Sequence, residues 1–351
     1  MVSAEQSGHV AWSGRRACRQ CESMMAVALQ KSVVASGCDA NAEAVGVSTK
    51  WPSLADELAL AGRLFGSSGE SKVDCWVNEQ AALVEDGEFA RTFSDHVALP
   101  GVASPDYAHR HVRTARGDLL AGIRFYSRNT ARPFVDVLAH SFDDIDALTS
   151  CVVAEWSNFN VRFLRMRTTP HLLADRPDVI LDKSIHLSRC HDMAPADGRV
   201  TLDRFDTAED ALHLVADRYA HVAEADPVLS NNLTAAQPDN LRDWHEHEQM
   251  WAIRTGNDTV GVFAVAAGAL GWITGLEIKE EVISVGHAGK RLAASTQCAW
   301  AHGWSADAAD LLIGAIDRHN HASRATALRA GRARVLDDIF VAASQTDERA
   351  S

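Results

Sequence analysis

The segment from Ser284 to Gln297 carries residues that are well suited to binding an anion. It reads SVGHAGKRLAASTQ, it follows an apolar strand pattern, and a helix is predicted over 290–302. The first turn of a helix has N–H groups without intrahelical partners, and the helix dipole favours negative charge there. Gly289 leaves room for a phosphate near the backbone, and Lys290 and Arg291 add positive charge. The segment suits a pyrophosphate, although a plain strand–loop–helix junction has the same pattern.

A second segment, about thirty residues downstream, favours the anion-binding interpretation. It reads IGAIDRHNHASRATALRAGR and runs from a short apolar strand into a helix through Asn320, Ser323, Ala327 and Gly331. The Asn320 amide could hold the strand end or a ligand, and Ser323 could cap the helix or reach a phosphate. An ordinary capped helix explains this segment alone. It does not predict a glycine-bearing loop one helix and one strand upstream.

Together the two segments resemble motifs A and B of the GNAT N-acetyltransferase superfamily. Motif A has the form Arg/Gln-x-x-Gly-x-Gly/Ala, and the second motif has the form Asn-x-x-(Ser/Ala) ending in Gly-Phe or Gly-Arg. This chain departs from motif A at its first position, Ala288, and at its fourth, Arg291. The resemblance implies that acetyl-CoA is bound as a co-substrate. The residues expected to bind it are Ile283, Val285, Ala288, Gly289, Lys290, Arg291, Leu292, Ala293, Asn320 and Ser323.

The same resemblance implies where catalysis would occur. Acetyl transfer to an amine needs a polarised thioester carbonyl, a neutral amine and a proton for the departing thiolate. The superfamily often places a glutamate general base on the fourth strand. Three candidates lie there, Glu277, Glu280 and Glu281, and Glu277 is favoured because it is furthest from the phosphate loop. A solvated strand edge is the alternative interpretation of this trio.

The usual general acid of the superfamily is a tyrosine seven residues after the asparagine, and Ala327 stands at that position. Solvent or another group, such as His287, would then protonate the thiolate. The remaining alternative is that this copy is not catalytic.

The chain's 351 residues suit two domains. Both halves show the pattern strand, strand, strand, helix, strand. The resemblance covers roughly Val200 to Ala342, and the region from Pro52 to Ser188 looks like a degenerate second copy. There Asp143 and Asp144 replace the glycine loop and would repel a pyrophosphate.

We therefore expect an α/β (α+β) protein of two tandem GNAT-like domains, each a mixed, mostly antiparallel sheet flanked by helices. The expected divisions are a flexible tail over 1–50, a degenerate domain over 51–192 and an acetyl-CoA-binding domain over 193–346. Strands are predicted at 109–115, 119–127, 134–140, 161–167, 200–205, 250–255, 259–267, 272–284 and 311–317. Further helices are predicted at 24–31, 54–64, 143–158, 207–224, 238–247 and 322–330.

Charge and composition narrow the class of partner. A net charge of −13 argues against non-specific binding to nucleic acid and is compatible with a cationic amine. The uncharged stretch 259–276 contains four glycines and is shorter than a usual membrane span, so two strands and a turn are predicted. A cytoplasmic protein without membrane contact is expected.

Two other clusters were considered as sites. The CxxC pair Cys18 and Cys21 has no second pair nearby, and WHEHE at 244–248 lacks the HExxH spacing, so no metal site is predicted. The WHEHE segment is a better candidate for lining an acceptor pocket. Arg162, Arg165 and Arg167 alternate along a strand, which indicates a solvated or inter-domain face, with a phosphate site as the minor alternative.

The leading hypothesis is an acyl-CoA-dependent N-acetyltransferase that moves an acetyl group to an amine by direct attack. The alternative is a catalytically silent acyl-CoA-binding or scaffold protein with the same fold. The amine is expected to be a small molecule or a peptide, and a homodimer is left open.

Overall fold

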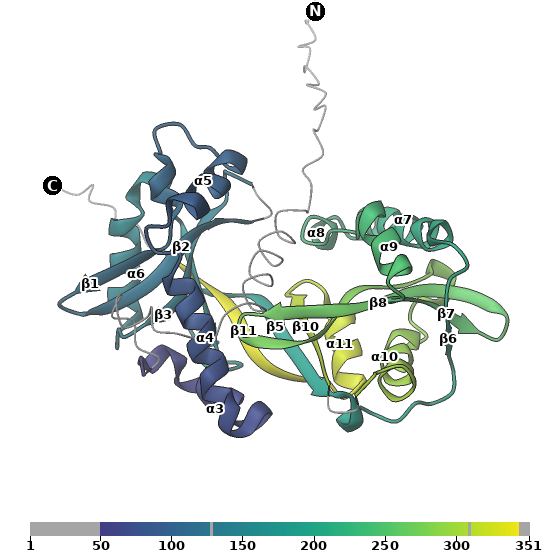
Figure 1. Cartoon of the computed structure of the whole chain (residues 1–351). Helices are drawn as coiled ribbons and strands as arrows, with labels where there is room; N and C mark the ends of the chain where they lie inside the picture. The colour runs from purple at the N-terminus through teal and green to yellow at the C-terminus, as the bar shows by residue number, and fades with distance from the viewer. Residues whose placement is uncertain (1–49, 127–128, 308–309, 344–351) are drawn as a thin grey trace, which may run out of the picture. The chain divides into compact units, whose positions relative to one another are not determined.

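The computed structural model describes residues 50–126, 129–307 and 310–343, whose eleven strands form a single sheet (Figure 1). The strand order is β1-β2-β3-β4-β11-β5-β10-β9-β8-β7-β6. The strands are β1 (Arg110–Thr114), β2 (Gly117–Phe125), β3 (Pro133–His140), β4 (Phe163–Thr168), β5 (Val179–Arg189), β6 (Thr201–Asp203), β7 (Met250–Thr255), β8 (Asp258–Leu270), β9 (Ile273–Ile283), β10 (Leu311–Asp317) and β11 (Ala333–Ala342).

Helices cover both faces of this sheet. They are η1 (Pro52–Leu54), α3 (Ala55–Phe65), η2 (Gly66–Ser68), α4 (Gly69–Ala81), α5 (Gly87–His96), η3 (Ser104–Tyr107), α6 (Ile145–Glu155), η5 (Ser157–Phe159), η6 (Cys190–Asp192), α7 (Ala208–Ala225), α8 (Pro227–Ser230), α9 (Pro238–Glu246), η7 (Val285–His287), α10 (Leu292–Gly303) and α11 (His321–Arg329). No helix in the described ranges combines the length and the apolar character that crossing a bilayer requires.

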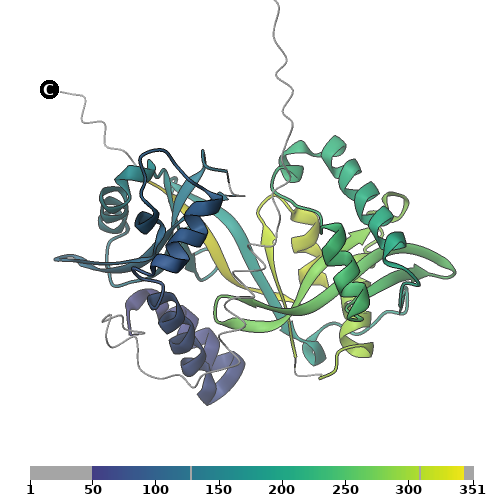
Figure 2. The same cartoon turned by 45° about the horizontal axis from the view of Figure 1, so that its top comes forward.

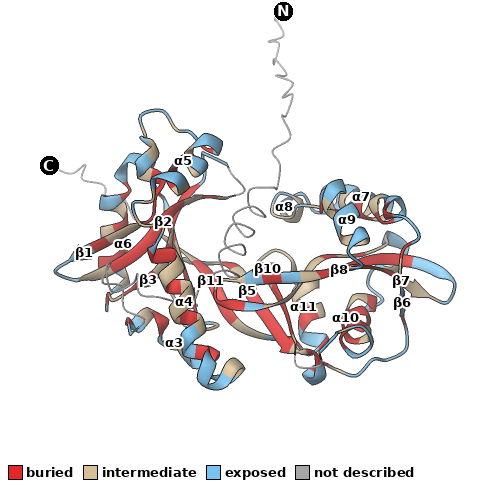
Figure 3. Ribbon diagram, viewed as in Figure 1, coloured by how far each residue is buried: buried red, intermediate tan, exposed pale blue. Residues whose placement is uncertain are grey.

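Two separate sheets were expected, and one sheet is found, because each half of the chain lends its last strand to the other. β11 ends the C-terminal half (193–343) and pairs antiparallel with β4 of the N-terminal half (50–192). β5 ends the N-terminal half and pairs antiparallel with β10 of the C-terminal half. β5 and β11 also pair with each other at the centre, where Figure 3 shows them mostly buried.

The two halves repeat one strand arrangement around this centre. The order β1-β2-β3-β4-β11 on one side corresponds to β7-β8-β9-β10-β5 on the other. Each half contains one parallel pair, β3 with β4 and β9 with β10, joined through α6 and α10 respectively. The architectural repeat expected from the sequence is therefore present, with its last strands exchanged.

Four apolar clusters hold the helices on the sheet. In the C-terminal half, α10 packs on one face through Leu292, Cys298 and Trp300, whereas α7 and α9 cover the other face through Val215 and Leu241. Figures 1 and 2 show these helices on opposite sides of β7, β8 and β9. In the N-terminal half, α5 and α6 belong to one cluster, and α3 and α4 belong to a second that reaches β5, β9 and β10.

Most predicted elements are confirmed to within a few residues, including the strands β8 and β9 over the uncharged stretch. The helices α4, α5 and α8 and the strands β5 and β11 were not predicted. The helix predicted over 24–31 lies outside the described residues.

Candidate functional site

The parallel strands β9 and β10 pair at only two positions and then diverge. The pairs are Leu276 with Leu312 and Glu277 with Ile313. We call the unpaired remainder, 278–283 of β9 and 314–317 of β10, the β9–β10 fork. Within it, Lys279 is the extra residue of a β-bulge against β8. A bulge re-aims the backbone beside it, and bulges are common next to active sites.

The predicted anion-binding loop lies where β9 ends and α10 begins. η7 follows the strand, Gly289 has φ of 77° and Arg291 has φ of 62° before the helix starts at Leu292. α10 has no side-chain hydrogen bond at its N-cap, so no capping side chain takes up the donors of its first turn. The residues over 288–291 are exposed. The loop therefore has the geometry that the sequence predicts for an anion site.

An arginine that the sequence did not single out secures this loop. Arg199 donates from Nη1 to the Lys290 carbonyl at 2.9 Å and from Nη2 to Ser295 Oγ at 2.6 Å. Ser295 in turn donates to Asp197 Oδ2 at 2.8 Å. About ninety residues separate Arg199 from Lys290, so no local sequence signal connects them. The contact adds a guanidinium beside the loop.

The downstream segment builds both ends of α11. Asn320 is the N-cap, and its Oδ1 accepts a hydrogen bond from the Ser323 backbone N–H at 3.0 Å. Ala327 is fully buried, and Gly331 ends the helix with φ of 91°. A Cβ on Gly331 would lie 3.0 Å from the Ala194 backbone nitrogen. Helix capping and close packing account for these four residues, and a role for Asn320 and Ser323 in cofactor binding stays a prediction.

The structure separates the three glutamates of β9. The Glu277 carboxylate lies over Gly268 of β8 and forms an ion pair with Lys279. Glu280 is 6% exposed, and it accepts hydrogen bonds from the Tyr219 hydroxyl at 3.0 Å and from the Ala236 N–H at 2.8 Å. The interpretation as a solvated strand edge is therefore wrong for Glu280, which faces α7 and the segment leading into α9.

Glu281 belongs to a buried polar chain on the α10 side. Gln297 of α10 donates from Nε2 to Glu281 Oε2 at 2.8 Å, and Arg332 donates from Nε to Gln297 Oε1 at 3.0 Å. The guanidinium of Arg332 lies over Gly314 of β10, so the chain bridges the two sides of the β9–β10 fork. Among the described residues, Glu281 Oε1 and Arg332 Nη1 are buried without a hydrogen-bond partner.

Burial changes the ionisation of both ends of this chain. It raises the pKa of Glu281 to about 7, an effect opposed by the hydrogen bond from Gln297 and by the charge of Arg332. It lowers the pKa of Arg332 to about 10, opposed by the charge of Glu281. Glu281 Oε1 can accept a hydrogen bond and Arg332 Nη1 can donate one, so a ligand group that both donates and accepts could bind to these two atoms.

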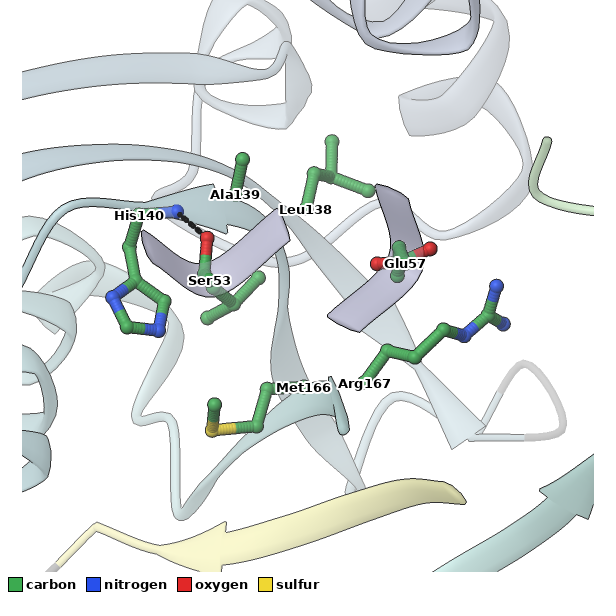
Figure 4. Close-up of a pocket in the computed structure, with 8 residues that line it drawn as sticks. Ser53, Glu57, Leu138, Ala139, His140, Met166 and Arg167 are labelled. Carbon is green, nitrogen blue, oxygen red and sulfur yellow. Dashed lines mark hydrogen bonds between the residues drawn. The ribbon is translucent and has the colours of Figure 1, made fainter. Parts of the chain in front are cut away.

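The corresponding fork of the N-terminal half is filled by the chain itself. β3 and β4 pair only at Val135–Leu164 and Asp136–Arg165, and Leu138 is the bulged residue, two positions past the last pair as Lys279 is in β9. Ser53 of η1 enters this fork and accepts a hydrogen bond from the His140 backbone N–H at 2.7 Å (Figure 4).

Little space remains in that fork. Glu57 of α3 is 3% exposed there, and the cavity that is left measures about 10 Å³, room for a single water at most. The N-terminus of α6 is also occupied, because Asp144 accepts hydrogen bonds from the Asp146 and Ala147 N–H groups at 3.0 and 3.3 Å. In an uncapped helix these first-turn N–H groups could bind an anion, but in α6 they are already paired with Asp144.

The three arginines that were predicted to alternate along a strand have different environments, and Arg162 precedes β4. Arg165 forms a two-point ion pair with Asp136 at 2.9 and 2.8 Å and also contacts Asp182 at 3.3 Å. Arg167 pairs with Asp338 of β11 at 2.8 and 3.2 Å, whereas Arg162 is exposed. A solvated face is therefore wrong for Arg165 and Arg167. Arg167 connects the two halves, whereas Arg165 joins β4 to β3 and β5 within the N-terminal half.

The two histidines of the WHEHE segment contact backbone carbonyls. His245 contacts the Phe205 carbonyl at 2.9 Å, and His247 contacts the Asp243 carbonyl at 2.8 Å. Cys18 and Cys21 fall outside the described residues. Within the described ranges, no three metal-ligating side chains come together. His287 contacts Ser284 Oγ at 3.1 Å, beside the anion-binding loop.

No family model and no curated protein matches this sequence. Similar solved structures include a GNAT-family acetyltransferase from Colwellia psychrerythraea, at 10% identity and TM-score 0.41, covering 74% of this chain and 96% of that chain. A GCN5-related N-acetyltransferase from Sphaerobacter thermophilus is similar at 11% identity and TM-score 0.39, over 74% and 92%. A tandem GNAT protein from the clavulanic acid biosynthesis pathway is similar at 13% identity and TM-score 0.34, over 75% and 98%. At such scores, the function has to be argued from the chain's own geometry.

Proposed function

We propose that this chain is an acyl-CoA-dependent N-acetyltransferase that uses acetyl-CoA as co-substrate and an amine as acceptor. The observation that carries the proposal is the difference between the two forks. The β9–β10 fork ends at an exposed glycine-bearing loop and a helix without a side-chain cap. The β3–β4 fork is filled by Ser53, and its helix is capped by Asp144. The sequence resemblance to GNAT motifs A and B assigns acetyl-CoA to the open one.

The residues at the open fork suit this co-substrate. The first-turn N–H groups of α10 would bind the pyrophosphate, and Lys290 and Arg291 would offset its charge. Arg199, which pairs with Asp197 at 2.8 Å, would hold the loop in place. Beyond Glu277, the edge of β9 that faces β10 has no strand partner. Its backbone groups are therefore available to the pantetheine arm and to the acetyl carbonyl, as predicted for Ile283 and Val285. The filled N-terminal fork is proposed to be silent towards the cofactor.

Among the three glutamates, we assign the general base to Glu280 rather than to Glu277. Glu280 lies past the bulge, inside the fork, whereas Glu277 is held over β8 by Lys279. Its two hydrogen bonds fix the position of its carboxylate, which as the ionised base would accept a proton from the incoming ammonium. Tyr219 is proposed to position this carboxylate.

The silent acyl-CoA-binding protein is the second candidate. It is favoured by Ala327, which is fully buried and carries no hydroxyl at the position of the family's general acid. Both oxygens of Glu280 are also engaged. Binding and turnover therefore have to be measured separately.

Thermal stabilisation by acetyl-CoA reports binding, because a ligand that prefers the native state raises its stability. Thiol release from acetyl-CoA in the presence of a panel of amines, amino acids and peptides reports turnover. We expect Glu280→Gln to bind acetyl-CoA like the wild type and to lose roughly 10²–10⁴-fold in thiol release. Glu277→Gln is the matched control on the same strand and should stay near wild-type activity.

The outcomes separate the candidates. Stabilisation without thiol release for any amine selects the silent binding protein. If Glu280→Gln retains activity and Glu277→Gln loses it, Glu277 is the general base. If no acyl-CoA stabilises the protein, both functions are refuted.

A further inference from the structure

A cavity of about 210 Å³ lies where the two halves meet, separate from both forks. Its walls come from the β2–β3 turn, the start of β4, the start of β5 and the end of β11, with one residue each from the segment after β10 and the segment between α8 and α9. The lining residues used below are Arg132, Arg162, Arg318, Phe134, Phe163 and Phe340.

The strand registers place this cavity at the end of the sheet to which the β9–β10 fork opens. Asp317, the last residue of β10, pairs with Lys183 of β5, and the start of β5 pairs with the end of β11. The end of β11 pairs in turn with the start of β4 at Phe163. The C-terminal end of β10, beyond its last pair with β9, therefore lies at the same end of the strands as the cavity.

The segment between α8 and α9 contacts both the cavity and the proposed general base. Asn232 of this segment lines the cavity, and Ala236, four residues later, donates its N–H to Glu280. An amine held in the cavity would therefore be bordered by the segment that also holds the Glu280 carboxylate.

Three guanidinium groups give the cavity its charge. Arg132 lies over the Tyr126 ring at 4.1 Å, Arg318 donates from Nε to His319 Nε2 at 2.8 Å, and Arg162 is exposed. Within the described ranges, none of the three forms an ion pair with a carboxylate. The buried Asp182 in the wall is already paired with Arg165 at 3.3 Å. In a chain of net charge −13, a cluster of arginines without a carboxylate partner favours binding of an anion.

Aromatic rings form the apolar part of the wall. The Phe340 ring lies 5.2 Å from Phe134, 5.8 Å from Phe163 and 6.1 Å from Tyr126, measured between ring centres. The volume is below the roughly 300–1,000 Å³ of pockets for drug-sized ligands, so a small ligand fits.

We propose that this cavity binds the acceptor of the transfer through a carboxylate, and that the acceptor is an amino acid with an apolar side chain. The arginines bind the carboxylate, the rings pack against the side chain, and the amine faces the fork. This inference rests on the proposed function, which leaves the acceptor unspecified. The proposed acceptor carries a carboxylate in addition to its amine, which the net charge of the chain alone does not suggest.

Direct binding tests the cavity without any acetyl-CoA. Calorimetry on the full chain would compare L-phenylalanine with L-phenylalaninamide and phenethylamine, which lack the carboxylate. We expect the amino acid to bind at least about tenfold more tightly, the order expected for hydrogen bonds between charged groups. Arg162→Gln and Arg318→Gln should each weaken binding of L-phenylalanine by about tenfold and leave phenethylamine unchanged. Arg116→Gln, an exposed arginine on the β1–β2 turn, is the matched control.

A second variant tests the location. Ile180 lines the cavity and is 38% exposed, so Ile180→Trp should fill the space without disturbing the core and abolish binding of L-phenylalanine. Equal affinity for the amino acid and its amide overturns the proposal. So does unchanged affinity in the Arg162, Arg318 and Ile180 variants, or no binding of L-phenylalanine by the wild type.

Thiol release with the same three compounds separates this inference from the proposed function. Faster turnover of phenethylamine than of L-phenylalanine would refute the carboxylate preference and leave the transferase standing. Arginine-dependent binding of L-phenylalanine by a protein that acetyl-CoA does not stabilise would refute the transferase, and with it the acceptor role, but not the carboxylate site.

Discussion

Ser53 Oγ lies 2.7 Å from the backbone nitrogen of His140 and accepts its hydrogen bond. His140 stands four residues past the last parallel pair of β3 and β4, as Glu281 stands four residues past the last pair of β9 and β10. The segment η1 thus binds, in the N-terminal half, a strand edge that the C-terminal half leaves available to a ligand. This side-chain contact is one of the differences between the two forks, together with the Asp144 cap of α6.

We predict that Ser53→Ala destabilises the protein. His140 is 5% exposed, and the substitution leaves its N–H without the hydroxyl acceptor. An unsatisfied buried donor costs about 1–3 kcal/mol, so the free energy of unfolding in a urea titration should fall by that amount. Ser68→Ala is the control, because Ser68 makes only a local, exposed contact with the Phe65 carbonyl. Equal stability of both variants would mean that water replaces the hydroxyl.

Gly331 is predicted to be a structural residue, not a cofactor contact. Gly331→Ala would place a Cβ 3.0 Å from the Ala194 nitrogen at a φ of 91°, so we expect a loss of about 1–3 kcal/mol in the free energy of unfolding. Affinity for acetyl-CoA should be unchanged in the folded fraction. Gly303→Ala, where a Cβ would meet open space, is the control and should be nearly neutral. Weaker acetyl-CoA binding with unchanged stability would contradict the structural role.

The elements that the sequence predicts are those with a regular apolar pattern, and the two central strands lack one. β5 buries Asp182, Ser184, His186 and Ser188 along a single face, and β11 buries the adjacent Asp337 and Asp338. The carboxylates are tolerated because arginines pair with them, from a distance in sequence for Asp182 and Asp338 and from three residues away for Asp337. An apolar pattern treats such strands as exposed loops. The exchange of strands between the halves therefore could not be predicted from the apolar pattern of the sequence.

The same distinction between local and distant contacts applies to the candidate site. The loop over 288–293 was predictable, because one glycine, a strand end and a helix start define its geometry. The bridge from Glu281 through Gln297 to Arg332 joins residues 16 and 35 positions apart, and no spacing rule connects them. The ion pair of Glu277 with Lys279 joins two residues of one strand face, which the period-2 alternation of a strand allows, whereas the bulge at Lys279 depends on pairing with β8.

Arg165 is predicted to be important for the stability of the N-terminal half, whereas Arg162, which immediately precedes β4, is not. Arg165→Met leaves Asp136 buried without its two-point partner, a change that typically costs about 3–5 kcal/mol. Arg162→Met should shift the free energy of unfolding by about 0.5 kcal/mol or less, because the side chain is exposed. Chemical denaturation of the two variants gives the comparison. A small effect for Arg165→Met would show that the pair contributes little beyond its desolvation cost.

Glu281 should make the stability of the protein depend on pH. Its pKa rises from 4.5 to about 7 on folding, so between these values the native state binds the extra proton. The free energy of unfolding therefore falls as pH rises from about 4.5 to 7, and the loss is complete above pH 7. Glu281→Gln removes this dependence. It should match the wild type below pH 4.5 and exceed it above pH 7 by an amount on the order of 3 kcal/mol at most.

Urea titrations at several pH values, with Glu277→Gln as the control on the same strand, measure this difference. A gap between Glu281→Gln and the wild type that stays constant across the range would show that the buried carboxyl remains ionised throughout.

The left-handed backbone at Arg291 allows the anion-binding loop to be tested with one residue. Its φ of 62° favours glycine, which is also the residue of the motif A pattern at this position. Arg291→Gly should relieve about 1 kcal/mol of strain and retain acetyl-CoA binding through the backbone N–H groups of α10. Arg291→Asp places a carboxylate at the start of the helix, as Asp144 does for α6, and should weaken acetyl-CoA binding at least about tenfold. The two variants both lack the arginine, so the difference between their dissociation constants isolates the effect of negative charge at the loop. Equal affinities would show that the pyrophosphate does not bind at this helix end.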